Sequence, residues 1–397
     1  MLVLIGAFGV GLIGCAVLFT FFRSKAAWWE YGIAVAIPVI VALFAKLLIH
    51  YADAKTQELW GGHVLMATYQ EPYREWVTHT RQHCTGSGED RICWTETYRT
   101  CDHFGPRWYA EDNNGIGFSI SRETWERLAR QFANKEHQRV RRDYCRDAVG
   151  GRWVTTFQGN DEALEPVISL HHYDNPVVVS SSNLRLPKPS ADEIAMFKPF
   201  EYPEVRSSIR LGYDAAQFVL SQANGIPDAR QANEALIFHA AKWGRTKQQI
   251  IYVLVFQGQP LEASHVQEAL WQRGNKNEMV ICIGVDGANK VQWTRIFSWM
   301  LDANLHVAIR SAVMKHRDQE IRLLPIVEEA CALSLKMWER REFAEFNYLD
   351  YQPPLWATIL VFVISILVCA GVVVFAVKNP YNADGTSRRY RRRPRYY

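Results

Sequence analysis

Few side chains in this sequence combine the types and the spacing that catalysis or metal binding requires. His171 and His172, followed by Tyr and Asp, place two imidazoles near a carboxylate, and both kinds of group ligate transition metals. A loop whose imidazoles meet water is the simpler interpretation. Glu262, His265 and Glu268 stand on a predicted helix, where residues three apart share a face. His265 and Glu268 therefore form either a catalytic pair or part of a solvated surface.

Asp286 and Asn289 follow a predicted strand and offer oxygen ligands for a cation. No other acidic residue is near them in the sequence, so a hairpin turn is the simpler interpretation. The sequence contains no His-Glu-x-x-His motif, no Gly-x-Ser-x-Gly motif and no phosphate-binding Gly-x4-Gly-Lys loop. It therefore predicts no catalytic residues, no metal site and no cofactor.

Four of the eight cysteines fall within one polar region of the chain. Residues 75–84 and 91–101 alternate threonine and aromatic residues, which predicts two strands joined by a turn. Cysteines on facing strands can pair, and such pairs are typical of oxidising compartments. The predicted disulfides are Cys84–Cys93 and Cys101–Cys145.

The same cysteines allow a second interpretation. Cys84, Cys93, Cys101 and His103 carry the side chains of a structural zinc site. Structural zinc ligands usually come in close pairs such as Cys-x2-Cys, whereas here eight and seven residues intervene between successive cysteines. The spacing favours disulfides over zinc. Cys282 and Cys331 lie in apolar segments and are predicted to be reduced core residues.

Three apolar segments, 1–22, 31–48 and 355–377, have about the length of 20 residues that a membrane-spanning helix needs. They predict an integral membrane protein with three transmembrane helices. Arg23 and Lys25 lie between the first two segments, and positive charge marks the cytoplasmic side. The sequence thus predicts a main domain on the periplasmic or extracellular side and a cytoplasmic tail at 378–397. A cleaved signal peptide is the alternative for the first segment.

The formal net charge of +4 arises from that tail. Without residues 378–397 the chain has 38 basic residues and 40 acidic ones, so its body is nearly neutral and no nucleic-acid partner is expected. Arginines beside a membrane bind anionic headgroups, which predicts membrane lipids as a partner. The arginines of this lipid-binding tail are Arg388, Arg389, Arg391, Arg392, Arg393 and Arg395.

Between the apolar segments, two lobes and a linker are predicted. Residues 55–182 contain short alternating runs with one helix, which indicates a β-rich lobe. Residues 183–208 are rich in Ser and Pro and are predicted to be a linker. Residues 209–350 alternate helices with continuous apolar runs at 249–256 and 278–285, which is typical of buried strands. The predicted fold is therefore α+β and α/β: a β-rich lobe and an α/β sandwich, anchored in a membrane.

The second lobe resembles a known family. A buried strand is followed by a helix ending in Ala-Leu-Trp-Gln-Arg-Gly at 269–274, then by Asn-Lys-Asn-Glu at 275–278 and a strand closing in Val285-Asp286. Across residues 245–320 this order looks like the TPM domain, some members of which are phosphatases or chaperone-like assembly factors. The runs at 255–263 and 275–278 are also similar to uncharacterised membrane proteins of large tailed phages.

These observations predict a membrane-anchored, non-catalytic interaction protein that displays a large domain outside the cytoplasm. The phage resemblance implies action at a host envelope, with an unknown protein partner there. The alternative, implied by the TPM resemblance, is a phosphatase or another metal-dependent hydrolase. The sequence offers no complete set of catalytic residues for the hydrolase alternative.

Overall fold

The computed structural model describes residues 9, 12–13, 16, 19–20, 32, 35–44, 55–85, 92–132, 134–140, 145, 152–159, 164–175, 186–203, 209–300, 303–342, 345 and 355–378. The chain divides into two compact units. One unit comprises Met1–Thr56, His172–Leu186 and Glu342–Tyr397. The other comprises Gln57–His171 and Pro187–Arg341, has a mixed α/β fold, and contains the features on which the functional argument depends.

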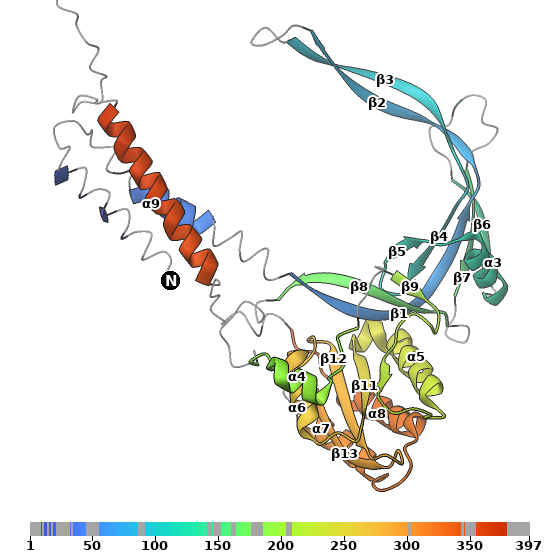
Figure 1. The fold of residues 1–397 in the computed structure, drawn as a ribbon. Coiled ribbons are helices and arrows are strands. Elements are labelled where there is room, and N and C mark those ends of the chain that lie inside the picture. The colour runs from blue at the N-terminus through green and yellow to red at the C-terminus, as the bar shows by residue number, and fades with distance from the viewer. Residues whose placement is uncertain are drawn as a thin grey trace, which may run out of the picture. The chain divides into compact units, whose positions relative to one another are not determined.

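A seven-stranded sheet forms the first layer of the mixed α/β unit (Figure 1). Its central strand pairs antiparallel with two neighbours, and one helix covers part of the sheet. Ser121 caps that helix by accepting a hydrogen bond from the backbone of Thr124. The strands are β1 (Lys55–Gln70), β4 (Arg107–Asp112), β5 (Gly117–Ser119), β6 (Asn134–Val140), β7 (Arg152–Gln158), β8 (Pro166–Asp174) and β9 (Ile209–Leu211), and the helix is α3 (Arg122–Gln131).

Two further strands form a separate hairpin between β1 and β4 (Figure 1). They are β2 (Tyr73–Thr85) and β3 (Ile92–Phe104), which pair antiparallel over their full length, from Tyr73 opposite Phe104 to Thr85 opposite Ile92. This confirms the predicted strand pair. In this hairpin, here called the β-arm, no residue of Tyr73–Thr85 or of residues 93–104 is buried. The turn residues 86–91 lie outside the described residues.

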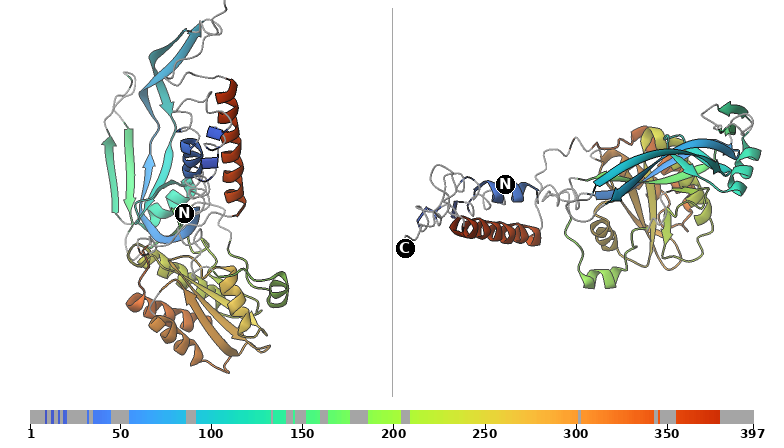
Figure 2. Two further views of the ribbon diagram at one scale, coloured as in Figure 1. Left: turned by 90° about the vertical axis from the view of Figure 1, so that its left-hand side faces the viewer. Right: turned by 90° about the horizontal axis from the view of Figure 1, so that it is seen from above.

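A four-stranded sheet forms the α/β layer, in the order β10-β11-β12-β13. The first three strands are parallel and the last is antiparallel, as a hairpin requires. Helices cover both faces of this sheet (Figures 1 and 2). The strands are β10 (Val219–Ser221), β11 (Ile250–Gln257), β12 (Glu278–Val285) and β13 (Val291–Ser298), and the main helices are α5 (Ala229–Lys247), α6 (Glu262–Leu270), α7 (Ala303–Met314) and α8 (Leu323–Met337).

The two apolar runs predicted to be buried strands are β11 and β12. Every residue of β12 is buried, and in β11 only the last residue is partly exposed. Side chains on a strand alternate between its two faces, so a strand that is apolar at consecutive positions needs cover on both sides. The surrounding helices provide that cover, and the core of the unit forms around these two strands.

The two predicted lobes are not separate domains in the structure but parts of one compact unit. Strand β1 connects them: the side-chain amide of Asn277 donates to the Leu59 carbonyl at 2.7 Å, and the His63 ring lies 3.2 Å from the Ala241 carbonyl. Leu59 also belongs to the hydrophobic core of the α/β layer. A backbone carbonyl buried without a partner is costly, so these hydrogen bonds fix β1 on the layer beneath it.

The segment predicted to be a linker is largely structured. It contains the helix α4 (Ala191–Phe197), and the residues after it pack on α6. The backbone of Phe200 exchanges two hydrogen bonds with the Gln267 side chain, at 2.7 and 3.0 Å, and accepts a third from the indole of Trp271 at 2.9 Å. The linker prediction followed from the Ser and Pro content of the segment. Its packing could not be predicted locally, because its partners on α6 are about 70 residues away in sequence.

The membrane assignment is wrong. Among the described residues, no helix is both long and apolar enough to cross a bilayer. The three transmembrane helices, and the sidedness derived from them, are therefore withdrawn.

Candidate functional site

The weak candidate site at His171 and His172 does not gather metal ligands. His171 stacks on Trp60 with ring centroids 3.8 Å apart, and its Nε2 lies 3.3 Å from the Ser169 hydroxyl. His172 is the next residue of β8 and, as strand geometry requires, points to the opposite face. No group of three or more metal-ligating side chains occurs among the described residues.

Asp286 and Asn289 form a turn, as the simpler interpretation held. One carboxylate oxygen of Asp286 accepts hydrogen bonds from the backbone of Ala288 and Lys290, each at 2.9 Å, and the other accepts from the Gln292 amide at 3.3 Å. Asn289 has a left-handed backbone with φ 59°, which asparagine tolerates. Both carboxylate oxygens are thus engaged within the hairpin, which does not favour a cation-dependent hydrolase at this position.

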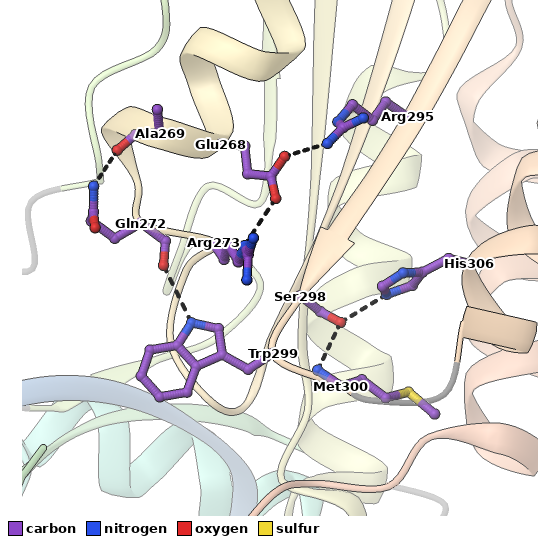
Figure 3. Close-up of polar contacts among 9 residues, drawn as sticks. All are labelled: Glu268, Ala269, Gln272, Arg273, Arg295, Ser298, Trp299, Met300 and His306. Carbon is purple, nitrogen blue, oxygen red and sulfur yellow. Dashed lines mark hydrogen bonds and ion pairs between the residues drawn. The ribbon is translucent and has the colours of Figure 1, made fainter. Parts of the chain in front are cut away.

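The predicted pair on α6 is separated, but its glutamate belongs to a charged cluster. His265 is exposed, whereas Glu268 is buried and forms ion pairs with Arg273 at 3.2 Å and Arg295 at 2.5 Å (Figure 3). Arg295 projects from β13, 27 residues further along the chain. A buried carboxylate needs such partners, because desolvation of an unpaired charge costs several kcal/mol. Sequence analysis missed Arg295 because nothing local links it to Glu268.

Beside this cluster lies a serine–histidine pair. The Ser298 hydroxyl lies 2.8 Å from His306 Nε2, and it also accepts a hydrogen bond from the backbone of Met300 at 3.2 Å (Figure 3). A nucleophilic serine needs an adjacent base, an oriented base and access to substrate. Ser298 is buried, at 9% exposure. Its geometry serves to join β13 to α7 rather than to present a nucleophile.

A second polar cluster is enclosed at the start of β12. Glu278 is fully buried; its carboxylate accepts hydrogen bonds from the Tyr202 hydroxyl, the Asn275 backbone at 2.8 Å and the Asn275 side chain at 3.0 Å. Burial raises the pKa of Glu278, even though these hydrogen bonds oppose the rise. Burial also raises the pKa of Tyr202, with the Glu278 charge adding to it. This cluster links Tyr202, in the segment after α4, to strand β12.

The predicted disulfides are present. Cys84 pairs with Cys93 across the β-arm, with Cα atoms 4.1 Å apart, and Cys101 pairs with Cys145, with Cα atoms 6.0 Å apart. The zinc interpretation is excluded for these four residues, because their sulfurs are bonded to one another. Cys331, predicted to be reduced, is free, and burial raises the pKa of its thiol to about 12. Disulfides of this kind are typical of an oxidising compartment.

One face of the β-arm carries stacked ring pairs, each formed by residues directly opposite in the register. Tyr73 stacks on Phe104 and His79 on Tyr98, with centroids 4.9 and 5.3 Å apart, and the Trp94 ring stacks in the same way near the tip. The His79 ring also meets Asp102 at 3.2 Å. Cross-strand aromatic pairs of this kind each contribute roughly 0.2–1 kcal/mol to a hairpin.

The opposite face of the β-arm has a different character. The Arg99 guanidinium lies over the Trp76 ring, 5.8 Å from its centroid, in a cation–π contact. Arg74, opposite His103, lies on the same face because it is two residues from Trp76. No carboxylate lies on this face along the two strands. Four threonines share this face with glutamine and cysteine side chains. Large apolar rings remain exposed on the β-arm: Trp76 at 38%, Trp94 at 50% and Tyr98 at 42%.

Comparisons with protein-family models, with curated proteins and with solved structures found no match to this chain. The TPM and phage resemblances therefore stay predictions. The arginines of the tail, from Arg388 to Arg395, lie outside the described residues, and their binding of lipid headgroups stays a prediction as well.

Proposed function

We propose that this chain is a non-catalytic interaction protein of an oxidising compartment, and that the β-arm is the element that contacts a protein partner. The observation that carries the proposal is the β-arm itself. Two strands of 13 residues each project from the sheet with both faces exposed, and they present Trp76, Trp94 and Tyr98 to solvent. Exposed aromatic residues on a rigid element are typical of binding surfaces.

The β-arm is built to hold its shape without a partner. A two-stranded hairpin is marginally stable in water, because it has no core of its own. Here Cys84–Cys93 closes it near the tip and Cys101–Cys145 ties its base to a buried cysteine. Preorganisation lowers the entropy that binding must overcome, since the backbone is already ordered. The two disulfides therefore keep the exposed β-arm in a fixed shape, as binding of a protein partner would require.

Catalysis is less well supported. The titratable groups that the structure brings together are either enclosed, as in the Glu278 cluster, or engaged in ion pairs, as with Glu268. Asp286, the acidic residue that could ligate a cation in a hydrolase, has its carboxylate engaged within a turn. No specific observation favours the phosphatase alternative over the interaction role.

The test uses the full chain with a photo-crosslinking amino acid at Thr80 or at Thr97, which face each other on the β-arm. The same protein should be captured from both positions and not from Arg230, which is exposed on α5. A shortened variant then removes residues 78–99 and joins Val77 to Thr100 through Asn-Gly. These two residues are opposite in the register, so a type I′ turn can close the hairpin there.

The captured partner, once purified, should bind the parent chain and lose binding to the shortened variant. The variant keeps Cys101 and therefore the disulfide to Cys145, so its far-ultraviolet circular dichroism should retain the signal of the two sheets. Equal capture at Arg230, or undiminished binding by the shortened variant, would show that the β-arm is not the binding element.

A further inference from the structure

A cavity of about 200 Å³ lies beside β13, at the edge of the α/β sheet. Strand β13 forms one wall and α7 another, and Leu261 at the start of α6 contributes a third side. The cavity is distinct from the β-arm and from the enclosed Glu278 cluster, which share none of its lining residues. Its character is set by two arginines, Arg295 and Arg310, and by His306.

The Arg295 guanidinium retains hydrogen-bonding capacity beyond its ion pair. Its Nη2 donates to Glu268, while its Nε is buried and has no hydrogen-bond partner. The buried Nε is out of reach of a bound molecule, so Arg295 can meet a ligand only through the exposed part of its side chain, which is 34% exposed. Glu268 cannot neutralise the arginine fully, because it is shared with Arg273 (Figure 3).

Arg310 adds a second positive charge to the cavity. It is exposed on α7 and pairs with no carboxylate among the described residues. Glu268, Arg273 and Arg295 together carry one net positive charge, so the described groups around the cavity sum to two with Arg310. A guanidinium binds carboxylate or phosphate strongly, because its donors match two oxygens at once. The excess charge therefore favours an anion.

The rest of the wall selects among anions. Leu261, Ile296 and Val307 line the cavity beside the arginines, and a free inorganic anion would leave this apolar surface facing water. A volume of about 200 Å³ holds some six or seven water-sized groups, at roughly 30 Å³ each. We propose that this cavity binds a small organic carboxylate, with its carboxylate on Arg295 and Arg310 and its apolar body against Leu261, Ile296 and Val307.

The test is binding of benzoate to the full chain, measured by saturation-transfer NMR, with benzamide as a neutral molecule of the same shape. Benzoate should bind and benzamide should not. Arg310→Gln should weaken benzoate binding about tenfold, the loss expected when a charge-assisted hydrogen bond is removed. Arg230→Gln is the matched control, since Arg230 is an exposed arginine on α5, outside the cavity lining, and should leave binding unchanged.

A second variant tests the site by filling it. Val307 is 60% exposed on the cavity wall, so Val307→Trp adds volume without disturbing the core and should abolish benzoate binding. Equal binding of benzoate and benzamide would overturn the role of charge. No binding of benzoate, unchanged binding after either cavity substitution, or tight binding of inorganic phosphate without benzoate would overturn the proposed ligand class. None of these outcomes depends on the β-arm.

Discussion

A close approach between strand β1 and helix α5 predicts the effect of a single methyl group. Gly244 lies inside α5, and a Cβ atom added there would stand 1.9 Å from the carbonyl oxygen of Gly61 on β1 and 2.5 Å from its carbonyl carbon. Real Cβ atoms essentially never come within 3.0 Å of such atoms. In Gly244→Ala, strand and helix must therefore separate by at least 1.1 Å.

Two effects of opposite sign decide the outcome. In an exposed helix interior, alanine is more favourable than glycine by about 1 kcal/mol. Overpacking costs about 1–3 kcal/mol, and here the colliding atoms are backbone, so no flexible side chain can yield and the upper end applies. Separation also strains the contact of the His63 ring with the Ala241 carbonyl, a further loss of about 1 kcal/mol. The expected net destabilisation of Gly244→Ala is about 3 kcal/mol.

The measurement is equilibrium urea unfolding of the oxidised full chain, followed by tryptophan fluorescence. Gly117→Ala provides the control, because a Cβ at Gly117 would meet nothing within 4 Å, and its midpoint should stay close to that of the parent. A Gly244→Ala protein that is as stable as the parent, or more stable by the helix-propensity gain, would refute the close approach of β1 and α5.

Three further predictions concern disulfides and pH. Replacing Cys101 and Cys145 by serine should lower the unfolding free energy by about 4 kcal/mol, because the pair closes a loop with a separation of 44 residues; an unchanged urea midpoint would contradict this. Burial lowers the pKa of His239 from 6.5 to about 4, so the folded chain resists protonation and the unfolding free energy should fall by about 3 kcal/mol as the pH drops from 6.5 to 4; His239→Gln should remove this loss in acid urea titrations. Glu278 acts in the opposite direction, since its raised pKa means that stability falls as the pH rises above 4.5; Glu278→Gln should flatten that part of the pH profile, and an identical profile would show that the carboxyl has the same pKa in the folded and unfolded chain.

Sequence analysis succeeded where the signal is local. The runs at 249–256 and 278–285 are apolar at consecutive positions, and the structure makes them β11 and β12 because only a strand covered on both faces buries every side chain of such a run. Cys84 and Cys93 flank one short turn, so their pairing follows from hairpin geometry alone. Short-range chemistry of this kind needs no knowledge of the rest of the fold.

It failed where a residue is explained by a distant partner. Glycine commonly ends helices, yet α5 continues past Gly244 to Lys247, and the glycine is required by β1, some 180 residues earlier. Arg295 was overlooked for the same reason: its meaning comes from Glu268, which the sheet brings within 2.5 Å. The cavity at β13 shows this most clearly, because nothing in the sequence around Arg295 and Arg310 distinguishes them from solvated surface charges. If Arg310→Gln weakens benzoate binding while Arg230→Gln does not, position in the fold, and not residue type, will have distinguished a binding arginine from a surface one.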